Sequence, residues 1–254
     1  MATPIERIFA GMIFELSIII IASLVLVLIF QKYRERKHEL TLYLFIIFLN
    51  FVIAIFFSWL VKVLDLYSGI EYLVEGNPDP GTVESWFLLR ISSFRFTFVF
   101  VAIALLFSYI LRVKLFDHEY VQAEKIAVLS FFGFNVFFLL VFFEKGNLLL
   151  DLLAFLFIAI LMFGVYFPFV MRSLQAYRSV TTPVHKRAFL SLTIMGVSFI
   201  LILIFEFLDR MLIFLGFSSY SAFYFLGWAF ALIGIVFAYL GYIRPKKEET
   251  NQKE

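Results

Sequence analysis

Residues 8–37 read IFAGMIFELSIIIIASLVLVLIFQKYRERK, an apolar run that is followed directly by a cluster of basic residues. As a helix rising 1.5 Å per residue, the run is long enough to cross the roughly 30 Å hydrocarbon core of a bilayer. Glu6 and Arg7 precede it in place of a purely basic segment. This pattern indicates a first membrane span with a stop-transfer flank, not a cleaved signal peptide.

The same kind of apolar run recurs along the chain. Hydrophobic residues make up 63% of the 254 residues, against about 45–50% in soluble domains. Seven spans are predicted over residues 8–30, 40–63, 86–111, 125–143, 147–171, 188–209 and 220–242. We therefore expect an all-α membrane protein, with one seven-helix transmembrane domain over residues 1–243 and a disordered tail over residues 244–254.

Charge in the loops predicts the orientation. Basic residues gather in segments 31–39 and 172–187 and in the tail, whereas the loop 64–85 holds five acids and no base. By the positive-inside rule the N-terminus lies outside and the C-terminus in the cytoplasm. The expected location is the cell membrane, with multiple spans.

Several kinds of chemistry have no support in the sequence. There is no cysteine, and the three histidines fall in loops predicted to be cytoplasmic. No metal-binding histidine pattern, no pair of intramembrane aspartates and no glycine-rich phosphate loop is found. We expect no enzyme activity, no metal, no cofactor and no nucleic-acid partner.

The charges inside the spans gather toward the outer side. They are Glu15, Arg90, Arg95, Asp151, Glu206, Asp209 and Arg210. Ionisable groups in membrane spans are costly and often mark a functional site. The inner halves are almost free of charge, so the pattern predicts a pocket that opens outward above an apolar floor.

Arg95 and Glu15 are the main candidates for that pocket. Each lies about 10–13 Å inside its span, at 1.5 Å per residue, and has no opposite charge one turn away on its own helix. We expect the two to pair, with Asp151 and Glu206 as alternative partners of Arg95. The pair would either bind a ligand or only fix helix packing. The third explanation for a charge at this depth is an error in the predicted span limits.

Two further residues complete the candidate ligand site, Arg90 and Glu206. Arg90 is close enough to the boundary to reach it with its long side chain. Glu206 has Arg210 one turn further on, which favours a local ion pair between them. Asp151, Asp209 and Arg210 are predicted to lie near the interface and to be solvated.

The seventh span carries a stripe of small residues. Its members are Gly227, Ala231, Gly234, Ala238 and Gly241. Spacings of four and three residues keep them on one helix face, which another helix backbone can approach closely. The stripe predicts packing within the bundle, with the first span as one partner, and a homodimer seam is the alternative.

In size and topology the chain resembles a microbial rhodopsin. That family needs a lysine in the middle of the seventh helix to bind retinal, and FYFLGWAFALIGIVFAYLGYI at residues 223–243 contains none. The third span, LLRISSFRFTF at 88–98, also lacks a carboxylate counter-ion. The comparison therefore argues against a covalent chromophore.

The chain also resembles the seven-helix sensory regions of prokaryotic histidine kinases. These often have a short basic loop that runs into the sixth helix, as in VHKRAFLSLTIMGVSFI at 184–200. The last span is followed only by YIRPKKEETNQKE, without a kinase domain. The resemblance implies output through a separate cytoplasmic signalling protein that binds the basic inner loops.

These observations favour a receptor-like membrane sensor. Its outward pocket would take a small or lipidic ligand, and an anionic one fits the two arginines. The alternative is a non-catalytic structural or accessory subunit of a larger membrane complex. A transporter or channel fits less well, because it needs polar residues through both halves of the membrane.

Overall fold

The computed structural model describes residues 4–67, 82–117, 119–144, 147–217 and 220–242. In these residues the regular elements are helices: α1 (Pro4–Arg36), α2 (Glu39–Tyr67), α4 (Val83–Ser92), α5 (Arg95–Arg112) with the π-helical turn η1 (Val113–Asp117), α6 (Gln122–Val141), α7 (Leu148–Ser179), α8 (Pro183–Phe214) and α9 (Ala222–Tyr242). Seven of them are long and apolar enough to cross a membrane. The all-α, seven-span prediction is confirmed, and the predicted tail lies outside the described residues.

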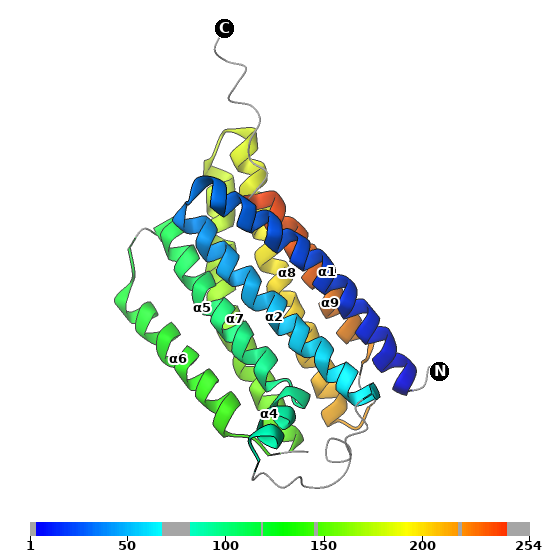
Figure 1. The fold of residues 1–254 in the computed structure, drawn as a ribbon. Helices are drawn as coiled ribbons and strands as arrows, with labels where there is room; N and C mark the ends of the chain where they lie inside the picture. Colours follow the sequence, from blue (N-terminus) through cyan, green and yellow to red (C-terminus); the bar gives the residue numbers. More distant parts are fainter. Residues whose placement is uncertain (1–3, 68–81, 118, 145–146, 218–219, 243–254) are drawn as a thin grey trace.

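Six helices form a ring, and the seventh lies outside it (Figure 1). The principal contacts follow the order α1, α2, α5, α7, α8, α9 and back to α1, while α6 packs from outside the ring mainly against α5 and α7. The end of the bundle that holds the start of α1 is named the outer end below. The loop charges predict that this end faces away from the cytoplasm.

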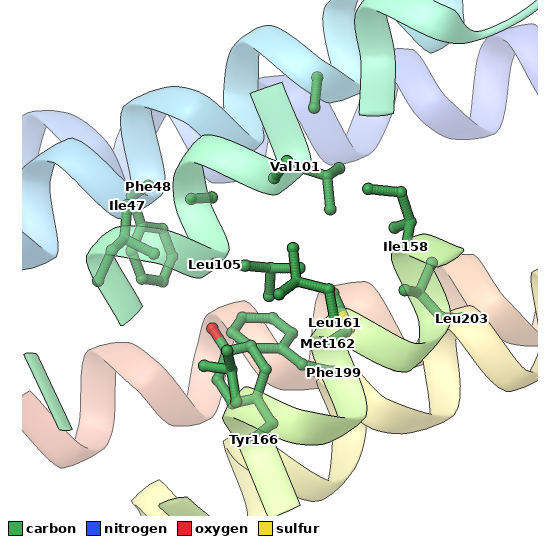
Figure 2. Packing of buried hydrophobic residues seen from close by; sticks show 14 of the residues in the cluster. Ile47, Phe48, Val101, Leu105, Ile158, Leu161, Met162, Tyr166, Phe199 and Leu203 are labelled. Carbon is green, nitrogen blue, oxygen red and sulfur yellow. The ribbon is translucent and has the colours of Figure 1, made fainter. Parts of the chain in front are cut away.

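The apolar core is centred on α5. Ala102, Ala104 and Leu105 of this helix have no exposed surface. Figure 2 shows Leu105 beside Leu161 and Met162 of α7, with Phe199 of α8 close by. Because small residues alternate with large ones along α5, its neighbours approach closely and fill the centre of the ring.

The small-residue stripe of α9 packs against α8. All five stripe residues are buried. A Cβ atom at Gly234 would lie 2.7 Å from the Phe199 ring, and one at Gly241 would lie 2.7 Å from Leu192. The stripe is thus a packing surface inside the bundle, and the partner of its glycines is α8, not the first span.

The predicted third span is not one continuous helix. α4 ends at Ser92, and Phe94 adopts a left-handed backbone conformation with φ of 60° before α5 starts at Arg95. Such a conformation is unfavourable for a residue with a side chain. The break places Arg95 in the first turn of α5, and this position decides which helices its side chain reaches.

Candidate functional site

Glu15 pairs with Lys62, not with Arg95 as expected. Its Oε1 accepts hydrogen bonds from Lys62 Nζ at 3.0 Å, Ser58 Oγ at 2.7 Å and the Tyr224 hydroxyl at 2.7 Å. The side chains of Glu15 and Lys62 are completely buried. These four residues, named the Glu15 cluster, connect α1, α2 and α9 in the outer half of the bundle.

Local features hold the Glu15 cluster together. Lys62 also donates to the carbonyl of Ser58, one turn earlier on α2, at 3.2 Å. Its ammonium lies 5.2 Å from the ring centroid of Tyr224. A Cβ atom at Gly11 would be 3.2 Å from the Tyr224 hydroxyl and 3.4 Å from Lys62, so the glycine one turn before Glu15 lets α1 approach.

Arg95 pairs with Asp151, one of the two alternative partners. Its Nη2 donates to Asp151 Oδ1 at 2.8 Å, and the exposed fractions of the side chains are 0% for Arg95 and 31% for Asp151. Arg95 Nε and Nη1 are buried and have no hydrogen-bond partner. A buried arginine therefore keeps donor capacity that Asp151 does not use.

Arg90 lies close to Arg95. Its Nε donates to the carbonyl of Leu140 at 3.0 Å, and its guanidinium stacks 4.0 Å from the Trp86 ring centroid. The ring of Phe143 lies 5.1 Å from the Arg90 guanidinium and 5.8 Å from that of Arg95. The two arginines expected at the site are thus brought together around Phe143.

Arg210 adds a third guanidinium, and it does not form the expected ion pair with Glu206. Its Cζ lies 4.7 Å from the Phe94 ring and 4.9 Å from the Phe155 ring, and its Nε has no hydrogen-bond partner. Glu206 Oε1 also has no partner, and it lies 3.2 Å from where a Cβ of Gly227 would be. Arg90, Arg95, Arg210 and Asp151 are named the arginine cluster; it holds three cationic side chains and one carboxylate.

Asp209 is not solvated, contrary to the expectation for this residue. Only 1% of it is exposed, and its carboxylate accepts a hydrogen bond at 2.8 Å from the backbone N–H of Ser221. This bond ties the end of α8 to the residue just before α9. Asp209 therefore stabilises the connection between the two helices.

Phe94 joins the two clusters. Its ring lies 5.3 Å from the Lys62 ammonium on one side and 4.7 Å from the Arg210 guanidinium. The left-handed backbone at the helix break turns the ring toward both cations. The result is a polar and aromatic network through the outer half of the bundle, with members on α1, α2, α4, α5, α7, α8 and α9.

The sequence reasoning did not identify Lys62. The predicted second span ended at residue 63, so the lysine fell at its boundary, whereas α2 continues to Tyr67. The spacing of Ser58 and Lys62 could have identified the lysine as part of a buried polar site. Two polar residues four apart in an apolar helix share one face and can be satisfied by the same partner.

The inner half is not entirely apolar. A small cavity lies there among α2, α5, α7, α8 and α9, lined by residues that include Ser108, Tyr166 and Tyr242. Ser108 Oγ and the Tyr166 hydroxyl are 3.0 Å apart, and the Tyr242 hydroxyl has no hydrogen-bond partner. The space suits about one water molecule, which is much smaller than a ligand pocket.

Nothing in the described residues resembles a metal site, since no three histidine, aspartate or glutamate side chains gather in a suitable group. Comparison of the chain with models of protein families, with curated proteins and with solved structures finds no match. The features of the described residues that bear on function are therefore the Glu15 cluster and the arginine cluster.

Proposed function

We propose that the chain is a receptor-like membrane sensor and that the arginine cluster binds an anionic group of its ligand. The observation that carries this proposal is the pair of unused, buried donor atoms on Arg95. The preferred ligands are a carboxylate or phosphate on a small or lipidic molecule. Guanidinium groups bind both with two parallel hydrogen bonds.

Energetics favour an anion at this position. A buried donor without an acceptor costs about 1–3 kcal/mol, and Arg95 has two such nitrogen atoms. Arg95 has one carboxylate partner, Asp151, and Arg90 lies within electrostatic reach of Arg95, whereas Arg210 also lies within electrostatic reach of Glu206. An incoming anion would satisfy the free donors of Arg95 and add a negative charge beside Arg90 and Arg95.

Asp151 supplies the resting partner of Arg95. It lies in the first turn of α7 and is 31% exposed, so its carboxylate can turn toward water when an anion takes its place. Exchange of Asp151 for the ligand would remove the ion pair between α5 and α7. A ligand shifts a conformational equilibrium only when its affinity differs between states. Here the two states are the one with the Arg95–Asp151 ion pair and the one without it, and the ligand would bind only the second.

A thermal-shift experiment tests the proposal. The purified chain in lipid nanodiscs would be heated with decanoate, decyl phosphate, decanol or decyltrimethylammonium. Ligand at about 100 times its Kd stabilises a protein by about 2.7 kcal/mol, and each kcal/mol raises Tm by about 2–4 °C for a chain of this size. We expect the two anions to raise Tm by several degrees, and the alcohol and the cation not to.

Variants make the test specific. Arg95→Gln should abolish the shift, whereas Lys114→Gln should keep it, because Lys114 pairs with Glu39 at the other end of the bundle. An equal shift with decanol, or an unchanged shift in Arg95→Gln, would refute an anion site at the arginine cluster.

A further inference from the structure

The hairpin formed by α7 and α8 extends beyond the rest of the bundle at the inner end. Each helix has 32 residues, which corresponds to a length of about 48 Å at 1.5 Å per residue. Because the hydrocarbon core is about 30 Å thick, roughly 18 Å remains outside it. Figure 1 shows the hairpin projecting past the turn between α1 and α2.

The tip of this hairpin, residues 172–187, is basic. It carries Arg172, Arg178, Lys186 and Arg187 and no acidic residue. All four are exposed. This is the short basic loop on which the resemblance to sensory regions rested, and the structure adds that helix continues through most of it.

The tip has a defined shape. The Lys186 ammonium lies 5.1 Å from the ring centroid of Tyr177 across the hairpin, and Thr182 Oγ1 is 2.8 Å from His185 Nδ1. Arg172 Nε forms an ion pair at 3.1 Å with Asp117 of η1, which anchors the base of the tip. The basic groups are therefore presented on an ordered helical surface.

The reach of the tip favours a protein partner over lipid. Headgroups add about 5–7 Å on each side of the hydrocarbon core. The predicted fifth span ends at residue 171, which puts Arg172 among the headgroups, and Arg178 is six residues, or about 9 Å, further along α7. Charges that lie past the headgroups are available to a protein in the aqueous phase.

The hairpin is also continuous with the candidate site. α7 carries Asp151 and α8 carries Arg210, both at the outer end, and the two helices pack closely against each other. A rigid-body movement of either helix at the arginine cluster would therefore displace the tip.

We infer that the hairpin tip is a docking surface for an acidic segment of a cytoplasmic partner protein. The inference rests on the proposed sensor function. It adds that the sensor would act on a partner protein that carries an acidic segment. Arg178, Lys186 and Arg187 would bind carboxylates of the partner. The ordered hairpin would set their spacing, so that affinity depends on this surface and not on positive charge in general.

A peptide-binding measurement tests the docking surface. The full chain would be placed in nanodiscs of neutral phosphatidylcholine and titrated into a fluorescein-labelled, 20-residue glutamate-rich helical peptide, with anisotropy as the readout. We expect Arg178→Gln with Lys186→Gln to weaken binding at least tenfold. The matched control, Arg34→Gln with Lys37→Gln, removes two exposed charges at the inner end of α1 and should change binding less than twofold.

Two outcomes would overturn the inference. The first is an equal loss of binding in the tip variant and the control, which would show that only the overall charge matters. The second is contact of the tip with lipid: a dye on Ser179→Cys would be quenched by nitroxide-labelled phosphatidylserine headgroups. The absence of native cysteine makes that label specific.

The peptide is titrated without decanoate, so this result does not depend on the anion site. Repeating the titration with decanoate then tests the coupling, which should change the peptide affinity of the natural chain but not that of Arg95→Gln. If decanoate fails to raise Tm while binding still depends on the tip, the docking surface stands and the anion-sensor proposal falls.

Discussion

Glu15 and Lys62 form a completely buried ion pair, whereas Arg95 pairs with a partly exposed Asp151. The difference matters because removal of one member of a buried pair leaves an uncompensated charge. Asp151 can be hydrated when its partner is lost, but Glu15 and Lys62 cannot. The Glu15 cluster is thus suited to hold the fold, and the arginine cluster to exchange partners.

A double-mutant cycle on Glu15 and Lys62 tests this assignment. We expect Glu15→Gln and Lys62→Met each to lower the free energy of unfolding by about 3–5 kcal/mol, since each leaves one buried group unpaired. The double variant should lose clearly less than the sum, with a coupling of at least about 1 kcal/mol. Reversible unfolding in mixed micelles provides the measurement.

A second cycle, on Glu15→Gln and Arg95→Gln, compares Arg95, the expected partner of Glu15, with Lys62, the observed one. A third cycle serves as the control. Glu15→Gln combined with Lys114→Gln, at the inner end, should be additive within about 0.5 kcal/mol. A stronger coupling of Glu15 to Arg95 than to Lys62 would contradict the observed pairing.

Phe94→Leu tests the aromatic junction between the clusters. The substitution keeps an apolar side chain and the same left-handed backbone but removes the ring shared by Lys62 and Arg210. Each desolvated cation–π contact contributes about 2 kcal/mol, so we expect a loss of about 2–4 kcal/mol in unfolding free energy.

Phe163→Leu is the matched control for this substitution, because Phe163 is 52% exposed and its ring stacks on that of Phe167, away from the cations of both clusters. A similar loss of stability in both variants would show that the cations near Phe94 are not important.

At the scale of helices, the contact between α8 and α9 depends on glycine. Phe199, which faces Gly234, is itself packed 5.2 Å from the rings of both Phe51 and Tyr166. The ring therefore has little room to move away from a larger residue. Packing against α8 therefore accounts for the small-residue stripe of α9 without a second copy of the chain.

Gly234→Ala should be destabilising. Its Cβ would lie 2.7 and 2.9 Å from two atoms of the Phe199 ring, and overpacking of this kind costs about 1–3 kcal/mol. Gly164→Ala in α7 is the control, since nothing lies within 4 Å of its Cβ position. It should be neutral or gain up to about 1 kcal/mol of helix propensity; a loss equal to that of Gly234→Ala would exclude the steric explanation.

The helices themselves could be predicted from apolar runs, but the break at Phe94 could not. LLRISSFRFTF contains neither glycine nor proline, and its two serines and two arginines do not by themselves end a helix. The ring of the left-handed residue contacts Lys62 and Arg210, which belong to other helices. Such contacts between helices are not visible in the pattern of a single span.

At the scale of the whole molecule, the order of helices around the ring decides which charges meet. Depth along each span was predictable, and it correctly placed Glu15 and Arg95 in the same half. Arg95 reaches Asp151 because α5 contacts α7, and Glu15 reaches Lys62 because α1 contacts α2. The number of spans could be inferred from composition, but these neighbours required the packed bundle.

The orientation remains a prediction from loop charge, and single cysteines test it. The chain has no native cysteine, so Val83→Cys, at a position that is 75% exposed, and Ser179→Cys can each be labelled alone. In intact cells a membrane-impermeant maleimide should label Val83→Cys only, and permeabilisation should add Ser179→Cys. The reverse pattern would place the arginine cluster on the cytoplasmic side.

The Glu15 cluster has a consequence for biogenesis. Glu15 is synthesised 47 residues before Lys62 and 209 residues before Tyr224, so all of α1 is synthesised before either partner. An ionised group at the centre of a membrane helix costs about 2.5–3.5 kcal/mol, whereas Ile, Leu, Val and Phe each contribute about −0.3 to −0.6 kcal/mol. Sixteen of the 23 residues from 8 to 30 are of these four types, which is enough to insert the helix with its glutamate unpaired. The density of aliphatic residues in α1 thus allows this helix to insert with an acid whose partners on α2 and α9 are synthesised later.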